Sequence, residues 1–191
     1  MTAPRAHVLG GRRGIGAAVV EALAARGFAV TYTYRTDPGP SGAAIIGVPL
    51  DLADRAAVDH FAAAQEDAPA WDVLVQVGGT TYDSLAAMMD QDAAERAMQV
   101  NFFAFARIAR ALVRPMMRAR SGRIVAIGSV IGQVASQGNA AYGATKAALL
   151  AYVRSLAIEC ALRGGTVIDG APGFVDTEMM APFAAYRGPT E

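Results

Sequence analysis

The chain has 191 residues, of which 53% are hydrophobic, and its formal net charge is zero. A chain of this size can bury one substantial core, so we expect a single domain over residues 1–191, and the balanced charge excludes the basic surface typical of proteins that bind nucleic acid or anionic membranes. The single cysteine, Cys160, excludes an internal disulfide framework and suits a reducing cytoplasm.

Short apolar runs rich in β-branched residues alternate with longer helical patterns along the chain. Strands are predicted at about 6–9, 28–34, 45–50, 73–77, 123–128 and 165–170. Helices are predicted at about 14–26, 54–65, 93–119 and 140–163, with a shorter one near 84–90. This alternation favours right-handed βαβ units, and therefore an α/β fold with a doubly wound parallel sheet covered on both faces.

A glycine-rich stretch, residues 10–16 (GGRRGIG), joins the first predicted strand to the first predicted helix. Glycines permit a tight turn and close approach of the backbone to a phosphate, and the helix N-terminus supplies free N–H donors. A glycine pattern alone is weak evidence, but here it has the strand before it and the helix after it that a dinucleotide site requires.

The second predicted strand ends at Arg35, where NAD-selective sites carry an acidic residue that binds the ribose 2′-hydroxyl. An arginine suits a 2′-phosphate instead, and we expect Arg12 and Arg13 to lie near the same corner. Asp37 is interpreted as a turn residue. The three arginines therefore favour NADP(H), although each one alone is more often a solvated surface charge.

Two features follow along the chain. The connector at 37–42 (DPGPSG) stands where a crossover helix is usual, and it is still long enough to return a parallel strand. Asp51 ends the third predicted strand, where its carboxylate could accept from an adenine amino group or could cap the following helix. Both interpretations of Asp51 remain open.

Lys146 is the only lysine in a chain whose other basic side chains are arginines. An ammonium is a compact charge whose pKa responds to its surroundings, whereas a guanidinium stays charged. Tyr142 precedes it by one helical turn, so the two side chains share a face. A nearby ammonium favours the ionised phenol, so we expect the pKa of Tyr142 to be lowered, as suits an acid/base catalyst. The alternative is a helix with a buried tyrosine and a solvated lysine.

Other features of the sequence indicate a cytoplasmic protein without a metal centre. His7 and His60 have no second ligand at metal spacing, so we interpret both as structural or surface residues. The first nine residues contain no apolar run typical of a signal peptide. The Ala-rich stretch 139–163 carries too many charges for a membrane span, and Cys160 within it is expected to pack as a small hydrophobic residue.

Ser129 follows the fifth predicted strand, ahead of the helix that carries Tyr142 and Lys146. Together with these residues, several stretches resemble the classical short-chain dehydrogenase/reductases, and among them most closely the 3-oxoacyl-[acyl-carrier-protein] reductases. The matching stretches are GGRRGIG (10–16), VQVGG (75–79), VNFFAF (100–105), IVAIGSV (124–130), YGATK (142–146) and APGFVDT (171–177). The resemblance covers nearly the whole chain and implies a Rossmann-like sheet in the order 3-2-1-4-5-6.

The resemblance also implies roles for individual residues. Tyr142 would be the general acid, and Lys146 would lower its pKa and bind the nicotinamide ribose. Ser129 would donate to the substrate carbonyl, and Asn101 would bend the long fourth helix and hold a water molecule in a proton relay. Cofactor contacts are implied for Gly10, Arg12, Arg13, Gly14, Ile15, Gly16, Arg35, Asp51, Leu52, Gly78, Gly79, Tyr142, Lys146, Pro172, Gly173, Val175 and Thr177.

Arg120 and Arg163 match positions that carrier-protein-dependent reductases use to hold the acidic acyl carrier protein. Arg118 and Arg123 could widen that patch. Solvated arginines at helix ends are also common, so an ordinary charged surface is the alternative interpretation.

Several positions depart from the family pattern. Leu9 replaces a threonine that ties the glycine loop, Ile168 replaces an asparagine, and Gln76 and Val77 replace an Asn-Asn pair, of which Gln76 could keep some hydrogen bonds. Family members continue past Thr177 through a substrate lid, another helix and a seventh strand.

The sequence ends at Glu191, after a tail (182–191) that predicts little structure. We therefore expect most of the lid and the seventh strand to be missing, together with one surface used in tetramers. The helices at 93–119 and 140–163 remain, and we expect them to form an isologous homodimer.

The leading hypothesis is an NADPH-dependent ketoreductase that acts on a small carbonyl compound or a 3-oxoacyl thioester, the latter presented by acyl carrier protein. A second is a non-catalytic or truncated nucleotide-binding protein, which the altered motif at 76–79 and the absent C-terminal segment favour. A third is a secondary-alcohol dehydrogenase using the same residues.

Overall fold

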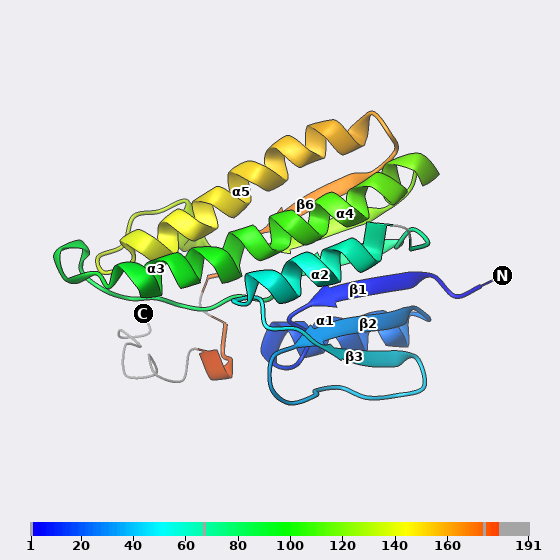
Figure 1. Cartoon of the computed structure of the whole chain (residues 1–191), viewed down its shortest axis with the longest axis horizontal. Coiled ribbons are helices and arrows are strands. Elements are labelled where there is room, and N and C mark those ends of the chain that lie inside the picture. Colours follow the sequence, from blue (N-terminus) through cyan, green and yellow to red (C-terminus); the bar gives the residue numbers. More distant parts are fainter. Residues whose placement is uncertain (1, 67, 174, 180–191) are drawn as a thin grey trace, which may run out of the picture.

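The computed structural model describes residues 2–66, 68–173 and 175–179, so the tail predicted at 182–191 lies outside the described residues. Within these ranges, strands and helices alternate as the sequence pattern predicts (Figure 1). The strands are β1 (Arg5–Leu9), β2 (Ala29–Tyr34), β3 (Ile45–Pro49), β4 (Val73–Gln76), β5 (Arg123–Ile127) and β6 (Thr166–Gly170). The α-helices are α1 (Gly14–Ala25), α2 (Arg55–Glu66), α3 (Gln91–Met98), α4 (Ala104–Ala119) and α5 (Ala140–Ala161).

All neighbouring strands of the described sheet are parallel, in the order β3-β2-β1-β4-β5-β6. This is the predicted doubly wound α/β arrangement. The carboxyl ends of the central strands therefore meet at one edge, on either side of the point where the order reverses between β1 and β4. In such a sheet, this edge is where ligands bind.

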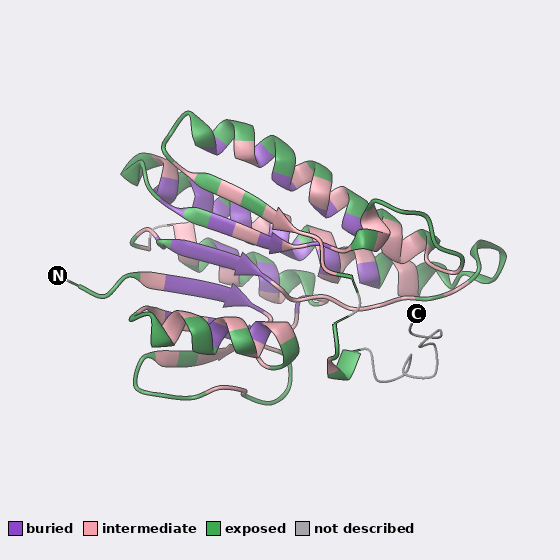
Figure 2. Cartoon of the chain, turned by 180° about the vertical axis from the view of Figure 1, so that it is seen from behind, coloured by how far each residue is buried: buried purple, intermediate pink, exposed green. Residues whose placement is uncertain are grey.

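The two faces of the sheet are covered unequally. Helices α2, α4 and α5 bury one face, in a core that includes Leu74, Ile124 and Cys160, so the cysteine packs as predicted. On the other face α1 covers Val8 and Val75, but the in-register row continues to Ile168 of β6, which is 50% exposed. Figure 2 shows the same gradient, with buried central strands and a more exposed β6.

The predicted helix at 93–119 is interrupted, because a π-helical turn, η2 (Gln99–Phe103), separates α3 from α4. The helix expected near 84–90 is only a short 3₁₀ turn, η1 (Ala86–Met88), and another such turn, η3 (Val130–Gly132), follows β5. The connector at 37–42 forms no helix, as expected, and the Tyr32 hydroxyl accepts from the Gly39 N–H at 2.7 Å. Among the described residues, no helix is both long and apolar enough to cross a membrane.

His7 lies in the core rather than near the functional edge. Its ring is 1% exposed and packs between Phe61 and Trp71, with ring centroids 5.4 and 5.0 Å away. Neither ring nitrogen has a hydrogen-bond partner, and burial lowers the pKa of His7 from 6.5 to about 4. The neutral ring is therefore the form that the folded protein accommodates.

We expect this histidine to make the fold acid-sensitive. Its pKa is lower in the folded than in the unfolded chain, so its contribution to stability is present above about pH 6.5 and is lost as the pH falls toward 4. Between pH 7 and pH 5 the loss should be about 2 kcal/mol, measured by urea unfolding. His7→Phe should remove that part of the pH dependence, and an unchanged slope in this variant would show that other groups cause it.

Candidate functional site

The glycine loop forms a tight turn between β1 and α1. Gly10 has a φ of 82°, and a Cβ atom at Gly16 would lie 2.0 Å from the carbonyl oxygen of Gly10, so no side chain fits there. The first turn of α1 carries no acidic residue. Bare backbone, free N–H groups and the positive end of a helix together fit the pyrophosphate of a dinucleotide.

Thr33 of β2 ties this loop in place, and sequence reasoning missed it. Its hydroxyl oxygen accepts from the Gly10 N–H at 3.0 Å, and its carbonyl oxygen accepts from the Gly11 N–H at 3.0 Å. Thr33 therefore makes a side-chain bond to a loop that lacks the family threonine at Leu9. The available signal was a β-branched polar residue at the end of a strand that pairs with β1.

The three arginines expected at the nucleotide corner have different surroundings. Arg12 contacts Asp37 at 3.5 Å, whereas Arg13 pairs with Glu178 at 2.6 Å. Arg35 is exposed just beyond the end of β2. Arg13 thus contacts the segment after β6. Asp37 was expected only to form a turn, but its carboxylate also contacts Arg12.

Two residues that follow β3 have clear local partners. The Asp51 carboxylate accepts from the Ala53 N–H at 2.9 Å, whereas Asp54 accepts from the Ala57 N–H and so caps α2. The capping interpretation of Asp51 is therefore wrong. Leu52 packs against Gly78, where an added Cβ would lie 2.6 Å from the Leu52 side chain.

The altered motif after β4 is held by substitute bonds. The Gln76 amide donates to the carbonyl oxygen of Gly78 at 2.7 Å, so Gln76 supplies a hydrogen bond in this altered motif, as expected. The Asn101 side chain makes two hydrogen bonds with the backbone of Thr80: its Oδ1 accepts from the Thr80 N–H at 2.8 Å, and its Nδ2 donates to the Thr80 carbonyl oxygen at 2.9 Å. The loop therefore keeps a defined path without the Asn-Asn pair.

Asn101 is fully buried in the π-helical turn η2, so the long helix is interrupted at the residue that was expected to bend it. Its Nδ2 also donates to the Thr145 hydroxyl at 2.9 Å, and that hydroxyl donates to the Tyr142 carbonyl at 2.7 Å. Thr145 was not predicted, although it stands between Tyr142 and Lys146 in the sequence. It links the bend in the long helix to α5.

Ser129, Tyr142 and Lys146 come together at the carboxyl end of β5. The Ser129 oxygen accepts from the Ile131 N–H at 3.2 Å, and a side-chain hydrogen bond joins Ser129 to Tyr142. Lys146 Nζ donates to the Ile127 carbonyl at 3.1 Å and lies 5.8 Å from the centroid of the Tyr142 ring.

Gly79 lies close to both Asn101 and Lys146. A Cβ atom at Gly79 would lie 3.2 Å from Asn101 Oδ1 and 3.6 Å from Lys146 Nζ, so a larger residue would crowd both groups. The residues predicted to be catalytic therefore share one corner of the sheet, next to the loop that follows β4.

Burial dominates the electrostatics of this corner. It lowers the pKa of Lys146 to about 8, while the Asp169 carboxylate opposes that change. Burial also raises the pKa of Tyr142; the hydrogen bond with Ser129 lowers it, and the charge of Asp83 raises it further. The expected lowering of the Tyr142 pKa is therefore wrong for the protein alone, because desolvation of the phenolate outweighs its favourable contacts.

The segment after β6 runs from this corner to the glycine loop. The Pro172 carbonyl accepts from the Val130 N–H at 3.2 Å, next to Ser129. Thr177 reaches Gly14, where an added Cβ would lie 3.3 Å from the threonine methyl group. Gly173 has open space beside it, and Val175 is 37% exposed. The predicted turn thus spans both halves of the candidate site.

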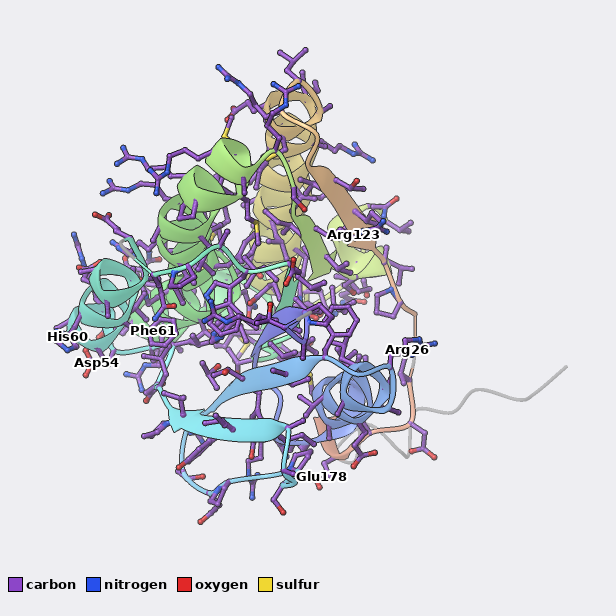
Figure 3. All side chains as sticks on the ribbon, turned by 90° about the vertical axis from the view of Figure 1, so that its right-hand side faces the viewer. Arg26, Asp54, His60, Phe61, Arg123 and Glu178 are labelled. Carbon is purple, nitrogen blue, oxygen red and sulfur yellow. The ribbon has the colours of Figure 1, made fainter. Side chains whose placement is uncertain are left out.

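Arg120 lies at the opposite edge of the sheet, not beside Tyr142 of the same chain. It lines a hollow with residues that precede strands or begin them: Pro4, Asp72, Arg123, Gly164 and Thr166. Arg163 is exposed immediately before Gly164, and Arg118 is in the last turn of α4. Figure 3 views the molecule from this amino-end side, with Arg123 labelled.

Comparison with known proteins agrees with this geometry. The sequence model of the short chain dehydrogenase family matches residues 4–187. The chain is 38% identical to the 3-oxoacyl-[acyl-carrier-protein] reductase FabG of Escherichia coli over 181 residues, which are 91% of this chain and 74% of that protein. It is 36% identical to the reductase MabA of Mycobacterium tuberculosis over 173 residues, 90% and 69% of the two chains. A solved short chain dehydrogenase/reductase family protein superposes with a TM-score of 0.88 at 28% identity, covering 95% of this chain and 79% of that one.

Proposed function

The chain belongs to the short-chain dehydrogenase family, and from this premise we propose that it is an NADPH-dependent reductase of 3-oxoacyl thioesters. The observation that carries the proposal is the convergence of Ser129, Tyr142 and Lys146 at one corner of the sheet. The product would be the 3-hydroxy compound.

The proposed chemistry divides between cofactor and protein. Bound NADPH supplies a hydride to the carbonyl carbon. Tyr142 donates its phenolic proton to the carbonyl oxygen, and its raised pKa keeps that proton in place until substrate arrives. Ser129 orients the carbonyl: its oxygen accepts from Ile131, and its O–H, which is bonded with Tyr142 in the cofactor-free protein, would donate to the carbonyl oxygen when substrate binds.

Lys146 and Asn101 would support that proton transfer. The Lys146 ammonium stabilises the phenolate that forms on Tyr142, and its remaining N–H donors can meet ribose hydroxyl groups. Asn101 holds the loop after β4 against α5. Both hydrogens of its amide are engaged, so we assign it this positioning role in place of a direct side-chain donor to a relay water.

The proposed cofactor preference rests on Arg12 and Arg35. Both flank the end of β2, where a 2′-phosphate would be bound. The last residue of β2 is Tyr34 and the next is Arg35, so no acidic residue stands at the end of this strand. Asp37 already contacts Arg12 at 3.5 Å in an exposed pair, and a phosphate would compete for that guanidinium. The bare glycine loop would hold the pyrophosphate.

A homodimer through α4 and α5 would complete the proposed assembly. Exposed apolar side chains on this part of the molecule include Phe103 and Ile158. Both helices run from the Tyr142 end toward the Arg163 end, so a two-fold antiparallel pairing would bring the arginine end of one copy toward the Tyr142 end of its partner. Arg120 and Arg163 could then attract an acidic carrier protein across the interface, despite lying far from Tyr142 in their own chain.

Absorbance at 340 nm, with a short 3-oxoacyl thioester as substrate, tests the proposed function. NADPH should be oxidised faster than NADH, at a rate well above that of the Tyr142→Phe variant. Micromolar NADPH binding without turnover would favour the non-catalytic alternative. Faster oxidation of secondary alcohols, with no thioester reduction, would favour the dehydrogenase alternative.

A further inference from the structure

Asp169 of β6 has a buried oxygen without a partner. Its Oδ1 makes no hydrogen bond in the described structure. Strand register aligns Asp169 with Ala126 of β5 and, through it, with Gln76 of β4, so the three side chains share one face of the sheet. Gln76 Oε1 is also buried without a partner, so two acceptors flank the small alanine.

The face of the sheet that carries Asp169 is also the face against which α5, the helix of Lys146, packs. Ala126 belongs to the same core as Leu149 of α5, one turn beyond the lysine. Asp169 also lies over the end of β5: an added Cβ at Gly128 would be 2.8 Å from its Oδ1, so only glycine leaves room for the carboxylate. Gly128 follows Ile127, whose carbonyl oxygen accepts from Lys146 Nζ at 3.1 Å.

Among the described residues, the Asp169 carboxylate is the charge that favours the ammonium form of Lys146, although the two groups form no direct ion pair. Tyr142 shares its helix, and Asp83 acts on Tyr142 rather than on the lysine. The adjoining turns η2 (QVNFF) and η3 (VIG) contain no ionisable side chain. The Asp169 carboxylate opposes the loss of the lysine's proton, against the effect of burial.

Resting on the proposed function, we propose that Asp169 is a positioning residue for the reductase reaction: its carboxylate is the counter-ion that keeps the buried Lys146 ammonium charged and held at the carboxyl end of β5. An ammonium that is 6% exposed and bonded to a neutral carbonyl loses much of its hydration. A carboxylate nearby restores the preference for the charged form. The same charge would keep Lys146 able to stabilise the Tyr142 phenolate.

Because Lys146 is the only lysine, labelling with ¹³Cε-lysine gives a single residue to follow by NMR. In the cofactor-free protein, Asp169→Asn should lower the titration midpoint of this signal by about one pH unit. Glu159→Gln removes the same charge from the far part of α5 and should leave the midpoint unchanged. This readout needs no turnover, so it can fail or succeed independently of the proposed function.

The pH profile of reduction supplies the second measurement. The alkaline limb of kcat/KM for NADPH should move to lower pH in Asp169→Asn, in parallel with the NMR midpoint, and Asp169→Glu should restore it toward the wild type. Asp169→Ala serves if the asparagine variant does not fold. An unchanged lysine titration in a folded neutral variant would overturn the proposal, even if activity fell.

Discussion

Tyr142→Phe is expected to lower kcat for thioester reduction by about 10²–10⁴-fold while NADPH binds with nearly unchanged affinity. The substitution removes one hydroxyl group, the proton donor in the proposed reaction, and leaves the ring in place. Its bond with Ser129 is lost, but the Ser129 oxygen still accepts from Ile131. Steady-state kinetics together with cofactor fluorescence titration would measure the two effects separately.

Tyr152→Phe provides a matched control on the same helix. Tyr152 packs edge-on against Phe102 and Phe105, with centroids 5.8 and 6.0 Å away, so its ring has a packing role. Its phenylalanine variant should keep most of the wild-type kcat. Equal losses in both variants would indicate damage to α5, and full activity in Tyr142→Phe would exclude this phenol as the proton donor.

The meeting of Ser129, Tyr142 and Lys146 could be predicted because it depends on topology. Ser129 follows a central parallel strand, and the spacing of Tyr142 and Lys146 places them on one helical face. The glycine loop could also be predicted, because its glycines and the strand and helix on either side of it are adjacent in the sequence.

Other features of the site depend on contacts between residues far apart in the chain, and the order of residues along the chain does not show such contacts. Thr33 and Asp169 act across strand register, so their partners at Gly10 and beside Gly128 could be known only once the strands were aligned. The pKa of Tyr142 was mispredicted because the spacing showed a neighbouring amine but not the depth of burial, which has the larger effect. Arg120 was identified from the family match alone, and such a match does not say where the residue lies in the fold. The structure places it at the amino-end side of the strands, far from Tyr142.

Lys146→Arg is expected to lower kcat by about 10²-fold or more, although the charge is kept. The lysine head group is 6% exposed and directs one donor at the Ile127 carbonyl, with Gly79 close by. A planar guanidinium is larger and brings five donors that this site would have to satisfy. The reciprocal control is Arg154→Lys on the exposed side of α5, which should leave kcat unchanged.

The pH dependence distinguishes loss of the amine from simple misfolding. Burial lowers the pKa of Lys146 to about 8, so its ammonium form prevails below that pH and is lost as the pH rises through it. Wild-type kcat/KM for NADPH, which reports the free enzyme, should therefore fall above about pH 8. In Lys146→Arg the residual activity should lack this limb, because the guanidinium does not titrate there. If the limb persists, another group controls it, and the sole lysine would not be the residue whose proton the reaction requires.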